Sequence, residues 1–362
     1  MDPEQRRPNI RLRGERIKIA LIPDRHGWAF DHICGQLTAA LSDEFDFKVI
    51  YMIDAENVIT ALREAEDCDI LHFFWRGELE DYDSPYCRAR IRMLGMNEKS
   101  FREKYIEGKY ISTEIYDHLL LSGASKQVTR DLFAGKKSLL SGYAVSSWKL
   151  KKIYDELPEI TLRPSMVLPD GVDLKLFSPA HLERFESIAS RTVKIGWVGN
   201  SSWQIEDLKG IHTIIRPAVA ELQAEGFDIE LVASDRTERL LPHEEMPAFY
   251  EGIDLYVCAS LFEGTPNPVL ESMACGVPVI STDVGLVQEV FGEKQKKFIL
   301  EERSVECLKE KIRLLLREPE LFKELSEENL LSIQEWSWEK MIPNFRTYFR
   351  ECAEDHNGVS ND

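Results

Sequence analysis

The sequence of 362 residues lacks a long apolar segment and lacks an overall excess of basic charge. No apolar run approaches the ~20 residues that a membrane-spanning helix needs. The arginine-rich first sixteen residues also lack the apolar core of a secretory signal, so we expect a cytoplasmic chain without a transmembrane segment. With 63 acidic and 45 basic residues, the net charge is −18. Nucleic-acid binding is therefore not expected, because phosphate contacts need clustered Lys and Arg.

The seven cysteines are odd in number, scattered, and contain no C-x-x-C pair. This pattern is typical of buried thiols in a reducing compartment, and it indicates neither a disulfide framework nor a zinc site. We therefore expect no metal site. No internal repeat with a period of roughly 20 to 50 residues is visible, which argues against a solenoid. A chain of this length instead predicts two domains of about 150 to 200 residues each.

One region departs from the acidic average. Residues 86–152 contain fourteen Lys and Arg but six Asp and Glu, a local net charge of +8. Such a region is either a solvated helical surface or a face that meets something anionic. The overlapping region 76–137 could seat an anionic glycan, a lipid phosphate or a membrane surface, and a solvated surface is equally compatible with it. Peripheral membrane contact through residues 86–152 stays open on this basis.

Strand-like and helix-like stretches alternate along both halves of the chain, which predicts two nucleotide-type α/β domains. A charged stretch at 76–109 is expected to be a loop and helix insertion. Strands are expected at residues 16–22, 48–53, 69–75, 110–115 and 141–145, then at 193–198, 229–233, 254–260 and 277–281. Helices are expected at residues 29–41, 58–66, 146–157, 211–225, 304–317, 319–332 and 338–352.

The most informative stretch is residues 254–283, DLYVCASLFEGTPNPVLESMACGVPVISTD. It predicts a buried strand, a turn, a short helix capped by Thr265 with Pro266 at its first position, and a second buried strand. Such a unit presents backbone N–H groups at the carboxyl end of a parallel strand, which makes an anion site. Glu263 and Glu271 bracket this site, where they could accept hydrogen bonds from hydroxyl groups on either side of a phosphate.

This string closely resembles the signature of the family-4 retaining glycosyltransferases. The matching features are an E-G-x-P string at 263–266, a second Glu separated from Glu263 by seven residues, and an A-C-G-V-P-V-I segment. Residues 169–177 are similar to the family's P-N-G-V-D-x-x-x-F segment, with Asp170 in place of Asn, and W-S-W-E at 336–339 also matches. Pro268 departs from the pattern and removes one backbone donor. The resemblance implies the α/β GT-B fold, in which two Rossmann-like, doubly wound domains face each other across a cleft.

The resemblance also implies the domain boundaries. The expected parts are an N-terminal, acceptor-side Rossmann-like domain (1–178), a linker (179–191), a C-terminal Rossmann-like domain for the nucleotide sugar (192–335), a C-terminal helix returning to the N-terminal domain (336–355) and a polar tail (356–362).

Three residues are expected to be catalytic by this resemblance: Lys209 against the diphosphate, Glu263 on the donor-sugar hydroxyls and His118 near the donor sugar. Glu271 would bind the ribose. The full set expected to bind the nucleotide sugar is Gly27, Arg25, Gly199, Asn200, Ser201, Lys209, Arg236, Glu263, Gly264, Thr265, Asn267 and Glu271.

Two positions depart from the family pattern. Asn200 stands where the family usually has Arg, so Arg25 or Arg236 could supply the missing cation, or backbone donors near Ser201 could stabilise the phosphate instead. The usual H-D string at a strand end reads Tyr116-Asp117-His118 here, so any of these three could take the role of the family histidine.

The function implied is that of a retaining, hexosyltransferase-type glycosyltransferase. It would use a nucleotide diphosphate sugar, with UDP or GDP expected, and it would need no cofactor. The reaction would be a metal-independent front-face displacement toward a glycan, lipid-linked or small-molecule acceptor. The alternatives are a nucleotide-sugar epimerase of the same architecture and a non-catalytic nucleotide-sugar-binding protein. The sequence leaves the acceptor and the oligomeric state open.

Overall fold

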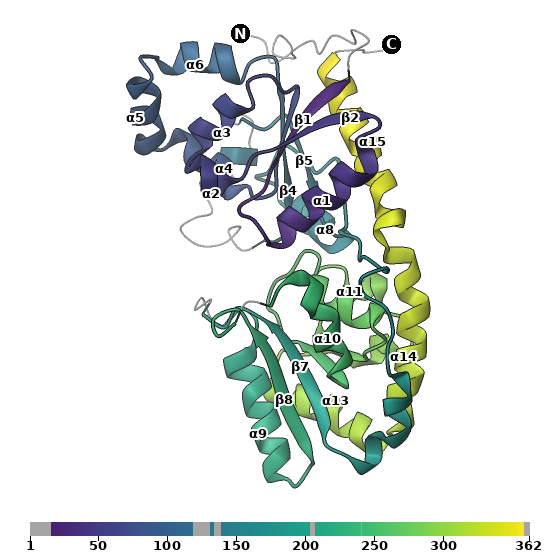
Figure 1. Cartoon of the computed structure of the whole chain (residues 1–362). Helices are drawn as coiled ribbons and strands as arrows, with labels where there is room; N and C mark the ends of the chain where they lie inside the picture. Colours follow the sequence, from purple (N-terminus) through teal and green to yellow (C-terminus); the bar gives the residue numbers. More distant parts are fainter. Residues whose placement is uncertain (1–15, 119–130, 134–138, 203–206, 240, 358–362) are drawn as a thin grey trace. The chain divides into compact units, whose positions relative to one another are not determined.

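The computed structural model describes residues 16–118, 131–133, 139–202, 207–239 and 241–357. Contacts divide the chain into two compact units, which are described separately below. The first unit is Met1–Pro169 with Ile342–Asp362, and the second is Asp170–Met341. Each unit has its own parallel sheet (Figure 1).

The sheet of the first unit has six parallel strands in the order β2-β1-β3-β4-β5-β6. Strands β3, β4 and β5 are buried along their whole length, as expected for parallel strands covered on both faces. The order changes direction between β1 and β3, so the loops at their carboxyl ends diverge there. The strands are β1 (Ile17–Ile22), β2 (Phe45–Val49), β3 (Ile70–Phe73), β4 (Tyr110–Ile115), β5 (Gly142–Val145) and β6 (Met166–Val167).

The helices of the first unit begin at polar caps wherever the sequence supplies one. Asn57, Ser84, Asn97 and Ser147 each accept a hydrogen bond from a backbone N–H of the first helical turn. The helices are α1 (Ala29–Leu41), α2 (Met52–Ala55), α3 (Val58–Glu64), α4 (Gly77–Glu80), η2 (Asp81–Asp83), α5 (Pro85–Met93), α6 (Glu98–Tyr105) and α8 (Trp148–Glu156).

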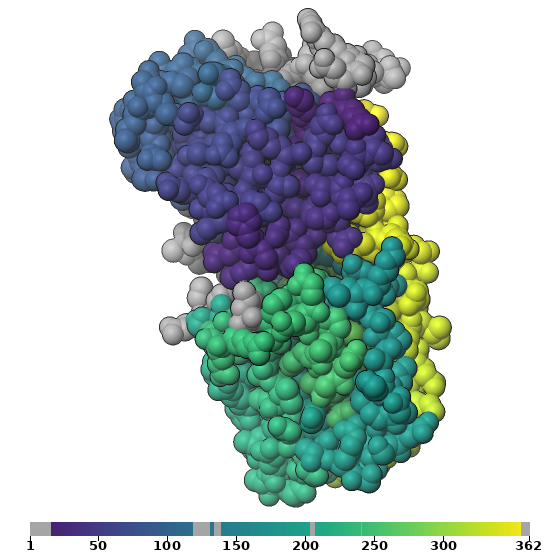
Figure 2. All heavy atoms as spheres, in the orientation of Figure 1, coloured from purple at the N-terminus to yellow at the C-terminus, as the bar shows by residue number. Residues whose placement is uncertain are grey.

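The C-terminal helix α15 (Trp338–Asn357) contributes aromatic side chains to the first unit. The ring of Phe349 contacts Phe45 and Phe47 on β2, and Tyr348 lies against His72 on β3. The helix therefore covers one face of this sheet with residues from the far end of the chain. The yellow atoms of α15 are also visible along the surface of this unit (Figure 2).

The second unit is built on a five-stranded parallel sheet in the order β11-β10-β9-β7-β8. Its first strand, β7, lies between β8 and β9, so the order changes direction between β7 and β9. This switch point is where ligands of open α/β sheets bind. The strands are β7 (Val193–Gly199), β8 (Ile229–Asp235), β9 (Leu255–Cys258), β10 (Val279–Thr282) and β11 (Ile299–Leu300).

Helices surround this second sheet. They are η4 (Leu182–Ser190), the π turn η5 (Ile211–Ile215), α9 (Arg216–Ala224), η6 (His243–Glu245), α10 (Met246–Glu251), α11 (Asn267–Ala274), α12 (Val287–Val290), η7 (Gln295–Phe298), α13 (Val305–Arg317), α14 (Glu320–Ser332) and η8 (Ile333–Trp336).

Several local predictions differ from the structure. Residues 179–191, expected to be a linker, carry η4, because Phe185 and Ile188 are apolar enough to pack into the core of the second unit. The strand expected at 48–53 is Phe45–Val49, and α2 begins at Met52. Thr265 does not cap α11, because its hydroxyl accepts a hydrogen bond from the N–H of Asp170 instead.

Other expectations concern the membrane, the thiols and the ends of the chain. Across the described ranges, no helix is long and apolar enough to cross a membrane. All seven cysteines are free, and six of them are buried. Residues 119–130 and 134–138 of the basic region, and 358–362 of the expected polar tail, lie outside the described residues.

Candidate functional site

An ion pair between Lys209 and Glu263 lies at the switch point of the second sheet. Lys209 follows β7, and Glu263 follows the neighbouring strand β9. The Lys209 Nζ donates to Glu263 Oε1 at 2.5 Å, and the Ser260 hydroxyl donates to the same oxygen at 2.7 Å. The two side chains of the pair are 24% and 15% exposed, so they are held in place and still accessible to a ligand.

The charge of Lys209 is stabilised by its partner. Burial opposes the charged ammonium, but the adjacent Glu263 carboxylate outweighs burial and raises the pKa of Lys209 above its ordinary value. Lys209 therefore carries a full positive charge at neutral pH. A phosphate that approached it would find a cation already desolvated and oriented, which strengthens the electrostatic interaction.

A tight turn positions Lys209. Both Asp207 (φ 48°) and Gly210 (φ 72°) adopt left-handed backbone conformations, which reverse the chain on either side of the lysine. The Asp207 carboxylate accepts hydrogen bonds from the backbone N–H groups of His212 and Thr213. A Cβ atom at Gly210 would lie 2.5 Å from the carbonyl oxygen of Ala259, so only glycine allows the turn to approach the end of β9 this closely.

Glu271 is the second acid of the motif and lies on α11. Its Oε2 accepts a hydrogen bond of 2.6 Å from the Tyr250 hydroxyl, and His243 Nδ1 lies 4.0 Å from its Oε1. Burial raises the pKa of Glu271 to about 7, although Tyr250 and Arg236 act in the opposite direction. The carboxyl group is 13% exposed and can therefore bind a ligand hydroxyl as well as Tyr250.

Arg236 supplies a second cation at this edge of the sheet. It directly follows β8, and its backbone N–H is bonded to the carbonyl of Gly199. Its charge lowers the pKa of both Lys209 and Glu271, so its guanidinium lies within electrostatic range of the two. Of the two cations expected to replace the arginine missing at Asn200, Arg236 is therefore placed beside the motif.

Residues 200–202, which directly follow β7, form local hydrogen bonds. The Asn200 side-chain oxygen accepts from the N–H and the hydroxyl of Ser202, while the N–H of Ser201 donates to Asp235. The structure thus brings Gly199, Asn200, Ser201, Lys209, Arg236, Glu263, Gly264 and Glu271 to the carboxyl edge of one sheet.

Thr265 and Asn267 differ from the other predicted residues, because their side chains bind Asp170. The Asp170 N–H donates to Thr265 Oγ1, and Asn267 Nδ2 donates to Asp170 Oδ2, each at 3.2 Å. Asp170 is 1% exposed. Thr265 and Asn267 therefore fasten the segment around Asp170 to the start of α11, an arrangement that sequence reasoning did not identify.

In the first unit, the loop after β1 carries Arg25 and Gly27. The Arg25 guanidinium lies over the ring of Trp28 and pairs with Asp24. The N–H of Gly27 (φ 67°) donates to Asp31 Oδ2 at 2.7 Å. The N–H of Gly27, a residue expected to bind the nucleotide sugar, is thus engaged by a carboxylate of the same unit.

His118 lies just beyond β4 in the first unit. Of the three residues considered for the histidine role, Asp117 is held by the buried guanidinium of Arg76 at 2.8 Å. Tyr116 packs against the ring of Phe30. Burial lowers the pKa of His118, although Asp117 acts in the opposite direction, so its imidazole is neutral at pH 7.

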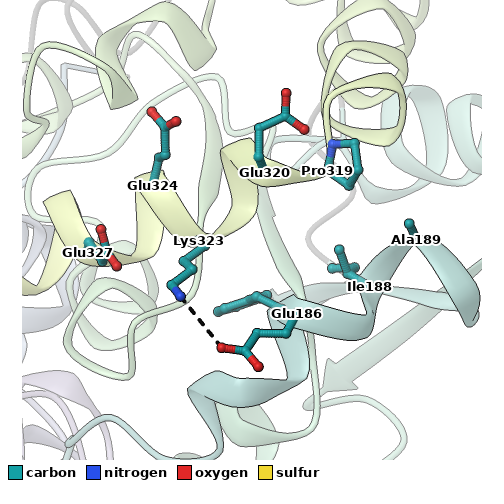
Figure 3. A pocket seen from close by; sticks show the side chains of 9 residues that line it. Glu186, Ile188, Ala189, Pro319, Glu320, Lys323, Glu324 and Glu327 are labelled. Carbon is teal, nitrogen blue, oxygen red and sulfur yellow. Dashed lines mark ion pairs between the residues drawn. The ribbon is translucent and has the colours of Figure 1, made fainter.

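A separate hollow of 510 Å³ lies between η4 and α14 of the second unit (Figure 3). Glu186, Glu320, Glu324 and Glu327 surround it, and Lys323 pairs with Glu186 at 3.6 Å. None of the predicted site residues is among the residues that line it. Such an acidic hollow does not suit a diphosphate. Within the described residues, no group of three or more His, Cys, Asp or Glu side chains is arranged to hold a metal ion.

Part of the second unit matches a known protein family. Residues 239–330, which include Glu263 and Glu271, match the family model described as glycosyl transferases group 1. The chain is 30% identical over 149 residues to the MMP alpha-(1->4)-mannosyltransferase of Mycolicibacterium hassiacum, which is 38% of this chain and 36% of that protein. The chain spans about a third of the length of the first curated relatives it matches.

Two solved structures resemble nearly the whole chain. HepE from Anabaena, in complex with UDP and glucose, aligns with 93% of this chain and 100% of its own at a TM-score of 0.65 and 12% identity. Sucrose-phosphate synthase from Thermosynechococcus elongatus aligns with 93% of this chain and 99% of its own at a TM-score of 0.63 and 15% identity. With its two parallel sheets, the chain has the α/β GT-B fold.

Proposed function

We propose that the chain transfers a hexose from a nucleotide diphosphate sugar to an acceptor, because residues 239–330 match the family model described as glycosyl transferases group 1. The observation that carries this proposal is the Lys209–Glu263 pair at the switch point of the second sheet, with Arg236 and Glu271 beside it. Two cations and two acids at one sheet edge suit a ligand that combines a diphosphate with hydroxyl groups on both sides.

Each residue would have a distinct role. Lys209, which stays charged, would stabilise the negative charge that develops on the leaving diphosphate, and Arg236 would add to it. Glu263 would then exchange part of its contact with Lys209 for hydroxyl groups of the donor sugar. Glu271, oriented by Tyr250, would accept hydrogen bonds from the ribose.

We further propose that the transfer retains the anomeric configuration. In a front-face displacement, the departing phosphate oxygen takes the proton of the acceptor hydroxyl while the new glycosidic bond forms. Neither Glu263 nor Glu271 is then needed as a nucleophile, in contrast to retaining glycosidases. His118, neutral at pH 7, would act as a hydrogen-bonding group near the donor sugar.

Two of the proteins compared above support the choice of donor class. HepE was solved with UDP and glucose, and the Mycolicibacterium relative is named a mannosyltransferase. Glucose and mannose are both hexoses, and UDP is a uridine nucleotide. We therefore propose a UDP- or GDP-hexose as the donor for this chain.

The proposal is tested first by binding and then by turnover. Thermal unfolding is measured with UDP-, GDP-, ADP- and dTDP-sugars, because a ligand that binds the native state raises the apparent melting temperature. The stabilising donor is then incubated without acceptor, and released nucleoside diphosphate is measured together with any epimerised sugar. We expect slow donor hydrolysis in the wild type and its loss in Lys209→Met and Glu263→Gln.

The matched control is Lys323→Met, which removes the same charge from an ion pair elsewhere in the second unit. It should keep the wild-type rate of hydrolysis. The proposal would be contradicted if none of the nucleotide sugars raised the melting temperature. It would also be contradicted if Lys209→Met kept the hydrolysis activity. Accumulation of an epimer without hydrolysis would point to the epimerase instead.

A further inference from the structure

Arg303 binds the backbone on both sides of the candidate site. It lies between β11 and α13, outside every motif that the sequence suggested. Its Nε donates to the carbonyl oxygen of Ala259 at 2.8 Å, and its Nη2 donates to that of Asp207 at 2.5 Å. One guanidinium thus joins the segment after β7 to the segment after β9.

The two carbonyl groups belong to the segments that carry the ion pair. Asp207 lies two residues before Lys209, and its carbonyl oxygen also accepts the N–H of Gly210 at 2.8 Å. Ala259 directly precedes Ser260, whose hydroxyl donates to Glu263. Arg303 therefore contacts the backbone that orients each charged group.

The turn around Lys209 needs such support. Besides Arg303, the described backbone contact between the two segments is the hydrogen bond from the N–H of Leu261 to the carbonyl of Leu208, at 2.8 Å. Asp207 has a left-handed backbone conformation, which is unfavourable for a residue with a side chain. A planar guanidinium can hold two acceptors in a fixed relation, whereas an ammonium on a flexible stem cannot.

We propose that Arg303 is a positioning residue that holds the turn of Lys209 against the end of β9, so that the ammonium stays aligned for a diphosphate. The inference rests on the proposed function, because it assigns Arg303 to the diphosphate half of the same ligand. The ribose half depends on Glu271 and Tyr250, which have no described hydrogen bond to Arg303.

This separation gives a readout that a general loss of structure would not produce. Arg303→Met should weaken binding of UDP and leave binding of uridine nearly unchanged. The same holds for GDP and guanosine if the guanine nucleotide is the better ligand. Because hydrogen bonds from charged groups contribute about 1.5–3 kcal/mol, we expect the diphosphate to lose roughly 10- to 100-fold in affinity.

Affinities of UDP, uridine, GDP and guanosine are measured by isothermal titration calorimetry for the wild type and four variants. Lys209→Met should lose the extra affinity that the diphosphate gives UDP over uridine, as Arg303→Met does. Arg303→Lys, which can still bind one carbonyl, should recover part of it and also serves if Arg303→Met folds poorly. Arg317→Met, an equal loss of charge at the exposed end of α13, should match the wild type.

Two outcomes would overturn the inference while the proposed function stands. One is unchanged UDP affinity in Arg303→Met when Lys209→Met has lost it. The other is an equal loss of UDP and uridine in both Arg303 variants, which would make Arg303 a purely structural residue. A wild type that binds neither diphosphate, or a Lys209→Met variant that binds it normally, would refute the proposed function and this inference together.

Discussion

The raised pKa of Glu271 makes the stability of the second unit depend on pH in a predictable direction. In the unfolded chain this carboxyl group ionises near 4.5, but burial raises its pKa to about 7 in the native structure. Between these values the native state holds a proton that the unfolded state has released. The contribution of this group to the free energy of unfolding is therefore fully present below pH 4.5 and is lost as the pH rises toward 7.

The size of the effect follows from the shift. The difference of about 2.5 between the native and unfolded pKa values corresponds to at most about 3.4 kcal/mol. The side chain is 13% exposed and receives a hydrogen bond from Tyr250, so we expect about 1–3 kcal/mol. Glu271→Gln keeps the shape and an acceptor for Tyr250 but cannot ionise. It should be more stable than the wild type by this amount at pH 8 and equally stable at pH 4.5.

The assay is urea unfolding of both proteins at pH 4.5, 6 and 8, because the difference between them cancels the titration of all other groups. Glu310→Gln, at an exposed position on α13, is the control for the loss of one carboxylate. The same Glu271→Gln variant should bind uridine more weakly than the wild type. A variant that is less stable at every pH, or a difference that does not change with pH, would refute the reasoning.

Three further predictions concern the charged groups and the metal requirement. Lys209→Met should lower donor hydrolysis by about 10²- to 10³-fold, because it removes a preorganised cation from the leaving group, and the rate is measured as released nucleoside diphosphate. Arg236→Met should weaken UDP or GDP binding in calorimetry by a smaller factor, and the loss should shrink at high salt because Arg236 is exposed. Activity should survive EDTA in the same hydrolysis assay, and its abolition with rescue by Mg²⁺ or Mn²⁺ would contradict the metal-independent mechanism.

Most strands of both sheets could be predicted from the sequence because buried parallel strands are continuous apolar runs. The two-residue strands β6 and β11 are too short to give such a signal and were not predicted. Strands are expected at residues 254–260 and 277–281; β9 lies within the first range, and β10 overlaps the second and ends one residue beyond it. The start of α11 was predicted less well. The Thr265 hydroxyl had two possible partners, the first turn of the helix and a backbone N–H 95 residues away, and only the fold decides that Asp170 is chosen.

The same distinction applies to the site. Lys209 and Glu263 could be recognised individually from their motifs, but their contact spans 54 residues. The contact exists because β7 and β9 are neighbours in the sheet, and the two residues follow the carboxyl ends of these strands. The hydrogen bond from Tyr250 to Glu271 likewise depends on the packing of α10 against α11, and no sequence pattern predicts it.

Arg303 marks the limit of sequence reasoning for a different physical reason. Motifs are recognisable when side chains bind side chains or ligands, because both partners are then restricted in type. Arg303 binds two backbone carbonyl groups, and every residue has one, so its partners leave no pattern in the sequence. Its role is visible only from the position of its donors relative to Lys209 and Glu263. Residues that shape a phosphate site through the backbone therefore have to be sought in the structure, at the loops that flank its switch point.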